Sequence, residues 1–390
     1  MRLVDKVAYG FAHWNAWWAR QSAAWGTCTT TSRLALLALA LQFANGCASV
    51  PHDEEFRATT AILPAAAPGV AADGRARFRD IFCTLSEDRG VSSARRGNAC
   101  EKLLWRLADE PSLQTAGYLP SLDPALQFFV VGGAFSDCFG AASIAFRDAI
   151  ERLAGDGYQV ADLTISSRSG AEHNARMIAE GLATAPDGPI VLLGYSKGAV
   201  DILHFLAGYP EMASRVVAVI SVAGPIMGSE VAEYGDWAYD NLLSDMFAGR
   251  CDPGDGGVLD SLLPQVRRDW LESHPLPDTV RFYTLLAFAG REHIARALLP
   301  SWEILASSDS RNDGQLTIEE GTWPGSTLLG YANADHWGVA IDIEKELNFL
   351  ADRPEDTGYP RGPLFEAALR YVSEDLRNRG FPQAAQESAF

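Results

Sequence analysis

Lysine is scarce in this sequence, and the chain as a whole is strongly acidic. Among 390 residues, 32 Lys and Arg stand against 50 Asp and Glu, which gives a formal net charge of −18. Lysine occurs only at positions 6, 102, 197 and 345. A surface with this excess of negative charge repels phosphate backbones, so the composition argues against a nucleic-acid partner.

Other patterns are missing as well. The chain has no apolar run of the roughly 20 residues that a membrane span needs, no CxxC or His-rich spacing typical of zinc sites and no internal repeat. No metal or organic cofactor is therefore expected. What remains is 47% hydrophobic and 21% charged, an ordinary globular mixture that excludes a fibre or a wholly disordered chain.

Residues 33–47 have the composition of an export signal. An arginine precedes a short apolar run, and the run ends at the small-residue boundary A-N-G-C-A-S. This ending resembles the lipobox of bacterial lipoproteins, in which the cysteine, here Cys47, is acylated. Ala44 and Asn45 depart from the usual box. A cut after Gly46 without lipidation and an ordinary amphipathic helix are the alternatives. We expect an envelope or secreted protein, with a lipid at Cys47 as its only membrane contact.

The rest of the chain divides into a tether and a folded body. Residues 48–72 are rich in Ala and Pro and show no periodicity, as is typical of a linker. Residues 73–390 are expected to form one domain. An acidic, Gly-rich stretch at about 225–279 interrupts its pattern and is expected to be a small cap.

Cysteine usage agrees with export. Four cysteines follow Cys47, and in an oxidising compartment they could form two disulfides with three alternative pairings. We favour Cys83–Cys100 together with Cys138–Cys251. The alternative is four buried free thiols.

The body alternates buried strands with amphipathic helices. Strands are predicted at 126–133, 158–166, 189–194, 216–224, 280–288 and 326–331, and helices at 143–155, 171–183, 199–208 and 363–378. Continuously apolar strands alternating with helices predict an α/β fold, a mostly parallel sheet with helices on both faces.

The clearest chemical signal is the sequence Gly194-Tyr195-Ser196-Lys197-Gly198, a G-x-S-x-G motif. It directly follows the strand PIVLL and directly precedes a helix, which is the context that the motif requires. Strand and helix come so close at such a turn that the residues two before and two after the serine must be small. In this respect residues 125–350 resemble the α/β-hydrolase serine esterases and lipases. A Gly-flanked serine in a tight turn is the structural alternative.

The resemblance implies a chain order of serine, acid and histidine. His336 follows the last predicted strand, where the family has its base, and Asp313 lies in an Asn-Asp-Gly loop similar to the acid loop of bacterial lipases. Asp309 is the reserve acid. We expect Ser196, His336 and Asp313 to be the catalytic residues. His204, two turns beyond the serine, is expected to be structural.

The resemblance also implies an oxyanion hole and an acyl pocket. One donor is expected to be the backbone N–H of Lys197, and the other that of Ala134, with Phe135 next. Many members of the family have His-Gly in the loop that supplies the second donor, where the present chain has Gly132-Gly133. The alternative is that these glycines only form a turn that leaves the sheet. Apolar walls are expected from Ile226, Met227, Phe135 and Trp337.

Together these features predict a serine hydrolase that cleaves small-molecule or lipid carboxylic esters through an acyl-enzyme. The same three residue types also serve amidases, peptidases and thioesterases, and a non-catalytic envelope binding protein can share the scaffold.

Overall fold

The computed structural model describes residues 72–89, 99–107, 110–113, 118–138, 140–238, 252–342 and 359–381. The predicted export signal, Cys47 and all but the last residue of the predicted tether lie outside these ranges. Within the described ranges, no helix is long and apolar enough to cross a membrane.

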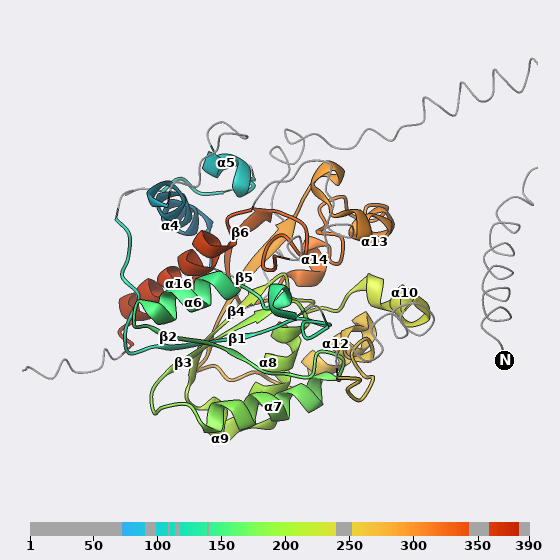
Figure 1. Cartoon of the computed structure of the whole chain (residues 1–390), viewed down its shortest axis with the longest axis horizontal. Coiled ribbons are helices and arrows are strands. Elements are labelled where there is room, and N and C mark those ends of the chain that lie inside the picture. Colours follow the sequence, from blue (N-terminus) through green and yellow to red (C-terminus); the bar gives the residue numbers. More distant parts are fainter. Residues whose placement is uncertain are drawn as a thin grey trace, which may run out of the picture. The chain divides into compact units, whose positions relative to one another are not determined.

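A six-stranded parallel sheet forms the centre of the fold, with the strand order β2-β1-β3-β4-β5-β6 (Figure 1). All six predicted strands are present, which confirms the predicted α/β class. Their bounds are β1 Gln127–Val131, β2 Gln159–Leu163, β3 Ile190–Tyr195, β4 Val216–Val222, β5 Arg281–Phe288 and β6 Thr327–Asn333.

Helices cover both faces of the sheet (Figure 1). On one side lie α4 (Arg75–Asp88), α6 (Arg147–Gly155) and α16 (Arg361–Asn378), and on the other α7 (Ala171–Ala183) and α8 (Lys197–Gly208). The two cores follow the alternation of side chains along a strand. In β3, Val191, Leu193 and Tyr195 belong to the first core, whereas Ile190 and Leu192 belong to the second.

The edge strand β6 is covered by the beginning of the folded body. Gly74 donates its N–H to Leu328, and Trp105 donates to Tyr331, so the free backbone groups of the edge strand are paired. The predicted Cys83–Cys100 disulfide is confirmed and ties α4 to α5 (Ala99–Leu103). Cys138 is also disulfide-bonded, but its predicted partner, Cys251, lies outside the described residues.

The connections after β4 and β5 contain most of the remaining helices. The stretch predicted to be a cap holds α10 (Glu230–Ala238), η3 (Asp260–Leu262) and α12 (Pro264–Ser273). Between β5 and β6 the chain forms short helices that its composition did not predict: η4 Arg291–His293, η5 Arg296–Leu298, α13 Leu299–Leu305 and α14 Ile318–Gly321. The other short helices are η1 Gly140–Ser143 and α9 Pro210–Ala213.

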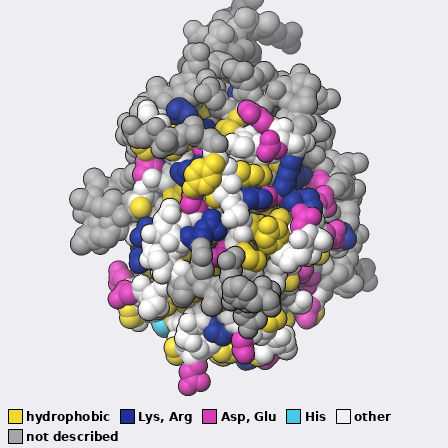
Figure 2. Space-filling view, turned by 90° about the vertical axis from the view of Figure 1, so that its left-hand side faces the viewer, with side chains coloured by type: hydrophobic (Ala, Val, Ile, Leu, Met, Phe, Trp, Pro, Cys, Tyr) yellow, Lys and Arg dark blue, Asp and Glu magenta, His cyan; other side chains and the backbone are white. Residues whose placement is uncertain are grey.

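Arginines gather around one buried carboxylate on α16. Glu366 is 1% exposed and pairs with Arg89, Arg152 and Arg370. Figure 2 looks onto the side of the molecule where α4, α6 and α16 lie, and it shows basic and acidic side chains interspersed among hydrophobic ones. Here the excess of arginine over lysine has a structural use, because the fork of N–H donors on a guanidinium matches the oxygens of a carboxylate.

Candidate active site

The turn between β3 and α8 has the strained backbone that the motif predicts. Ser196 has φ 53° and ψ −131°, a region that non-glycine residues rarely occupy and that strains the backbone. A Cβ atom on Gly194 would lie 2.4 Å from the backbone of Ala199, and one on Gly198 would lie 2.3 Å from the carbonyl oxygen of Val131. Both positions therefore require glycine, which confirms the steric interpretation of the motif.

Three side chains from distant parts of the sequence meet above this turn. The Nε2 atom of His336 lies 2.8 Å from Ser196 Oγ, and its Nδ1 atom lies 2.7 Å from Asp313 Oδ2. Asp313 is 1% exposed and His336 is 6% exposed, whereas Ser196 is half-buried. The predicted serine, histidine and aspartate thus form one hydrogen-bonded chain with the hydroxyl at its open end.

The loop around Asp313 fixes its carboxylate. The Oδ1 atom accepts the N–H groups of Gln315 and Leu316, each at 2.8 Å, and this leaves Oδ2 for His336. Gly314 has φ 91°, so the tight turn uses the left-handed region that glycine tolerates. The reserve candidate, Asp309, is paired with Arg311 instead.

Two neighbours hold the histidine in place. The hydroxyl of Tyr195 donates to the carbonyl of His336 at 2.8 Å, and the His336 N–H donates to the carbonyl of Asp313 at 2.8 Å. Burial and the nearby carboxylates raise the pKa of Tyr195 well above its ordinary value, so the phenol keeps its proton. The sequence showed Tyr195 only as the unspecified second residue of the motif.

The loop after β1 passes close to the serine. A Cβ atom on Gly133 would lie 2.9 Å from Ser196 Cβ, so Ala134 follows a residue in direct contact with the serine. The N–H of Phe135 donates to the carbonyl of Ser167 at 3.2 Å. The N–H of Phe135, the second candidate for the oxyanion donor, is therefore already hydrogen-bonded, and this favours the N–H of Ala134. Lys197 opens α8, where a backbone N–H has no partner within the helix.

The predicted apolar walls differ in burial. Ile226 has 0% exposure and packs in the same core cluster as residues of α8, so its side chain lies in the core and leaves no surface for a substrate. Met227, Trp337 and Phe135 are half-buried. In the described part of the chain, no group of three or more His, Cys, Asp or Glu residues is arranged to hold a metal ion.

Known structures include a similar protein. The crystal structure of the metagenomic carboxyl esterase MGS0156 shares 37% sequence identity with this chain, covers 82% of it and 98% of its own chain, and superposes with a TM-score of 0.73. The chain belongs to the α/β-hydrolase carboxyl esterases and lipases.

Two lipases of known structure are less similar. The mature lipase BlEst2 of Bacillus licheniformis is 23% identical, covers 65% of this hydrolase and 96% of its own chain, and has a TM-score of 0.46. Lipase 1 from Pelosinus fermentans is 12% identical, covers 64% and 99%, and has a TM-score of 0.47. A scan against protein-family models found no match, and neither did a search of curated proteins.

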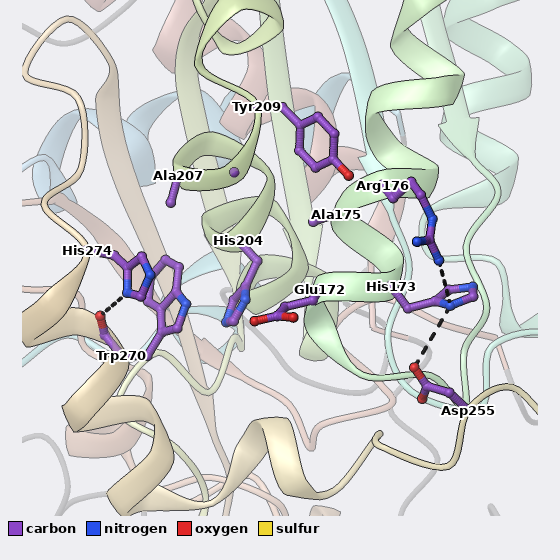
Figure 3. Close-up of a pocket in the computed structure, with 11 residues that line it drawn as sticks. Glu172, His173, Ala175, Arg176, His204, Ala207, Tyr209, Asp255, Trp270 and His274 are labelled. Atoms are coloured by element: carbon purple, nitrogen blue, oxygen red, sulfur yellow. Dashed lines mark hydrogen bonds and ion pairs between the residues drawn. The ribbon is translucent and has the colours of Figure 1, made fainter.

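The esterase also has a cavity of about 650 Å³ between α7, α8 and α12, and none of the three hydrogen-bonded residues above lines it (Figure 3). On one wall, Trp270 stacks on both His204 and His274, with ring centroids 4.2 and 4.5 Å apart. His204 Nε2 lies 3.0 Å from Arg267 Nη1. Burial and the charge of Arg267 lower the pKa of His204 to about 3, so the ring is neutral. His204 therefore packs structurally, as the sequence suggested.

Proposed function

We propose that this carboxylic-ester hydrolase uses Ser196 as nucleophile, His336 as general base and Asp313 as the acid that orients the base. The observation that carries the proposal is the continuous chain of two hydrogen bonds, 2.8 and 2.7 Å long, from Ser196 Oγ through the imidazole to Asp313. A serine hydroxyl is a weak nucleophile at neutral pH, and this arrangement supplies the base that it needs.

The reaction takes two steps. Ser196 Oγ attacks the ester carbonyl while its proton moves to His336 Nε2, and the tetrahedral intermediate collapses to an acyl-enzyme as that proton passes to the leaving alcohol. Water then attacks the acyl-enzyme, giving its proton to the same nitrogen, and Ser196 is released with its proton restored. Asp313 accepts the Nδ1–H throughout and stabilises the imidazolium.

The oxyanion is proposed to bind the backbone N–H groups of Lys197 and Ala134. The contact of Gly133 with Ser196 and the position of Lys197 at the start of α8 support this pair. Each donor of this type contributes about 10²–10³ in rate when it is correctly placed. The substrate is proposed to be a small-molecule or lipid ester whose acyl part lies beside Met227 and Trp337.

Hydrolysis of a p-nitrophenyl ester and labelling by a fluorophosphonate probe test the proposal. Ser196→Ala should abolish labelling and reduce kcat by about 10⁶, and Asp313→Asn should reduce kcat by about 10⁴. Ser214→Ala is the matched control, because Ser214 is exposed at the end of α9. Turnover by Ser196→Ala at the wild-type rate would overturn the assignment.

We also propose export to the cell envelope with a lipid on Cys47. The signal-like stretch 33–47 and the disulfide between Cys83 and Cys100 support it, since disulfides persist in oxidising compartments. In a bacterial host fed labelled palmitate, the wild-type chain should carry label and sediment with membranes, whereas Cys47→Ala should do neither. An unlabelled wild-type chain would overturn the lipid anchor.

A further inference from the structure

Lys197 directly follows the proposed nucleophile in the sequence, and its side chain is buried. Lys197 and Asp201 are each 0% exposed, lie one turn apart on α8, and pair through Nζ and Oδ1 at 2.5 Å. Withdrawing both charges from water costs about as much as their attraction returns, so such a pair is a poor source of stability. Lys197 is also the residue whose backbone N–H is a proposed oxyanion donor, which suggests a different use for the pair.

Asp201 is hydrogen-bonded to the neighbouring helix α7 and, through it, to the loop after β2. Its Oδ2 atom accepts a hydrogen bond from Asn174 Nδ2 on α7 at 2.8 Å, and Asn174 Oδ1 accepts the backbone N–H of Ser166 at 3.1 Å. Asn174 is 0% exposed, and Ser166 is buried as well. The four residues therefore form one continuous polar chain without solvent access.

The same loop contacts the other side of the proposed oxyanion hole. The carbonyl of Ser167, the residue after Ser166, accepts the N–H of Phe135, which directly follows Ala134. The hydroxyl of Ser167 also donates to Asp137 in that segment. One end of the polar chain thus lies at Lys197, and the other end, Ser166, adjoins the residue that binds Phe135, the neighbour of Ala134. Lys197 and Ala134 are the two residues proposed to supply the oxyanion donors.

The ionised state of Asp201 depends on both of its hydrogen-bond partners. Burial raises the pKa of the Asp201 carboxyl, and both Lys197 and Asn174 oppose that rise. If either partner were removed, a buried polar group would lose its hydrogen bond, and the local backbone would shift to relieve it. A shift of about 1 Å at a catalytic donor is enough to reduce the rate strongly.

We propose that Lys197, Asp201 and Asn174 are positioning residues that hold the two oxyanion donors at a fixed distance from each other. The inference rests on the proposed function. It assigns to the lysine side chain a part distinct from that of its own backbone N–H.

The test is Asp201→Asn, which keeps the shape of the side chain and removes its charge. We expect kcat for a p-nitrophenyl ester to fall about 10- to 100-fold, with KM changed less than about threefold, because the donors act mainly on the transition state. Binding of a trifluoromethyl ketone, whose serine adduct carries the oxyanion, should weaken by the same factor as kcat/KM. Wild-type kcat and wild-type ketone affinity in Asp201→Asn would overturn the inference.

A double variant separates positioning from stability. Lys197→Met with Asp201→Leu replaces the pair by apolar side chains of similar size, which commonly restores or raises stability. We expect it to remain folded, with a somewhat lower melting temperature because Asn174 Nδ2 loses its acceptor on Asp201, and to turn over slowly. Full recovery of kcat in this folded variant would overturn the inference. The double variant also keeps the test valid if Asp201→Asn fails to fold.

A buried ion pair elsewhere in the chain supplies the control. Arg79 and Glu110 are 7% and 1% exposed, and Glu110→Gln should lower stability without changing kcat. Failure of the proposed function has a different signature, because Ser196→Ala would then keep its activity. If activity depends on Ser196 and Asp201→Asn remains fully active, only the positioning inference fails.

Discussion

Tyr195 lies beside the proposed nucleophile in sequence but holds the proposed base in space. Its phenol donates to the carbonyl of His336, and its ring lies 5.4 Å from the imidazole. Tyr195→Phe should lower kcat about two- to tenfold and the free energy of unfolding by about 1 kcal/mol, the usual value of one such hydrogen bond. Steady-state kinetics and urea unfolding measure the two effects.

Tyr283→Phe is the matched control for this prediction. Tyr283 is also buried and donates its hydroxyl to a carboxylate, that of Asp375 on α16. It should lose a similar amount of stability and keep its kcat. Equal kcat values for both variants would show that the Tyr195 hydrogen bond contributes nothing to the geometry of the base.

His204 should make the protein sensitive to acid. Its pKa is lowered from 6.5 to about 3 in the folded protein, so the unfolded chain takes up a proton first as the pH falls. Stability is therefore lost progressively between about pH 6.5 and pH 3, at about 1.4 kcal/mol per pH unit at most.

The variant His204→Gln isolates that contribution, since a glutamine oxygen can still accept from Arg267. Urea unfolding at pH 7 and pH 4.5 should give a smaller loss of stability for the variant than for the wild type, by about 2 kcal/mol. Identical losses in the two proteins would assign the acid sensitivity to the carboxylates instead.

At the scale of single elements, α8 has two glycines in opposite surroundings. A Cβ on Gly198 would lie 2.3 and 2.5 Å from the carbonyl oxygens of Val131 and Gly132, whereas a Cβ on Gly208 would meet no atom within 4 Å. Gly198→Ala should therefore cost several kcal/mol of stability and at least 10²-fold in kcat, because β1 or α8 must move.

Gly208→Ala serves as the control within the same helix. Alanine favours the helix and restricts the unfolded chain, so thermal unfolding should show a gain of about 0.5–1 kcal/mol with kcat unchanged. If the two alanines had equal effects on kcat, the close approach at Gly198 would not matter for the site.

The elements that sequence predicts well are those with a strong local signal. Buried parallel strands are continuously apolar, so β1, β3 and β4 stand out. The turn at Ser196 is recognised because strand, glycines and helix occur together. The short helices between β5 and β6 were missed, because segments such as Ile318–Gly321 are too brief for a periodic pattern. Whether such short segments become helical depends on their tertiary contacts.

Side-chain roles that depend on distant partners were also beyond the sequence. Ile226 was expected to line a pocket, but its side chain has 0% exposure and packs in a core cluster with residues of α8. Nothing in the sequence indicated that the side chain of Lys197 is buried, because its partner Asp201 is itself held by Asn174, which is 27 positions from Asp201 and on another helix. Asp313 and His336 could be proposed from the sequence because each lies in a loop with a recognisable pattern.

At the scale of the whole molecule, the net charge of −18 should act on the encounter with substrate. A field of this sign slows the approach of an anionic ester, and dissolved salt weakens the field because the Debye length falls from about 30 Å at 0.01 M to about 8 Å at 0.15 M. We expect kcat/KM for an ester with a carboxylate on its alcohol part to rise severalfold over that range of sodium chloride. A neutral ester with the same acyl chain should change little, since it has no charge for the field to act on. A carboxylate ester that is hydrolysed more slowly at high salt would mean that positive groups near the site outweigh the net charge.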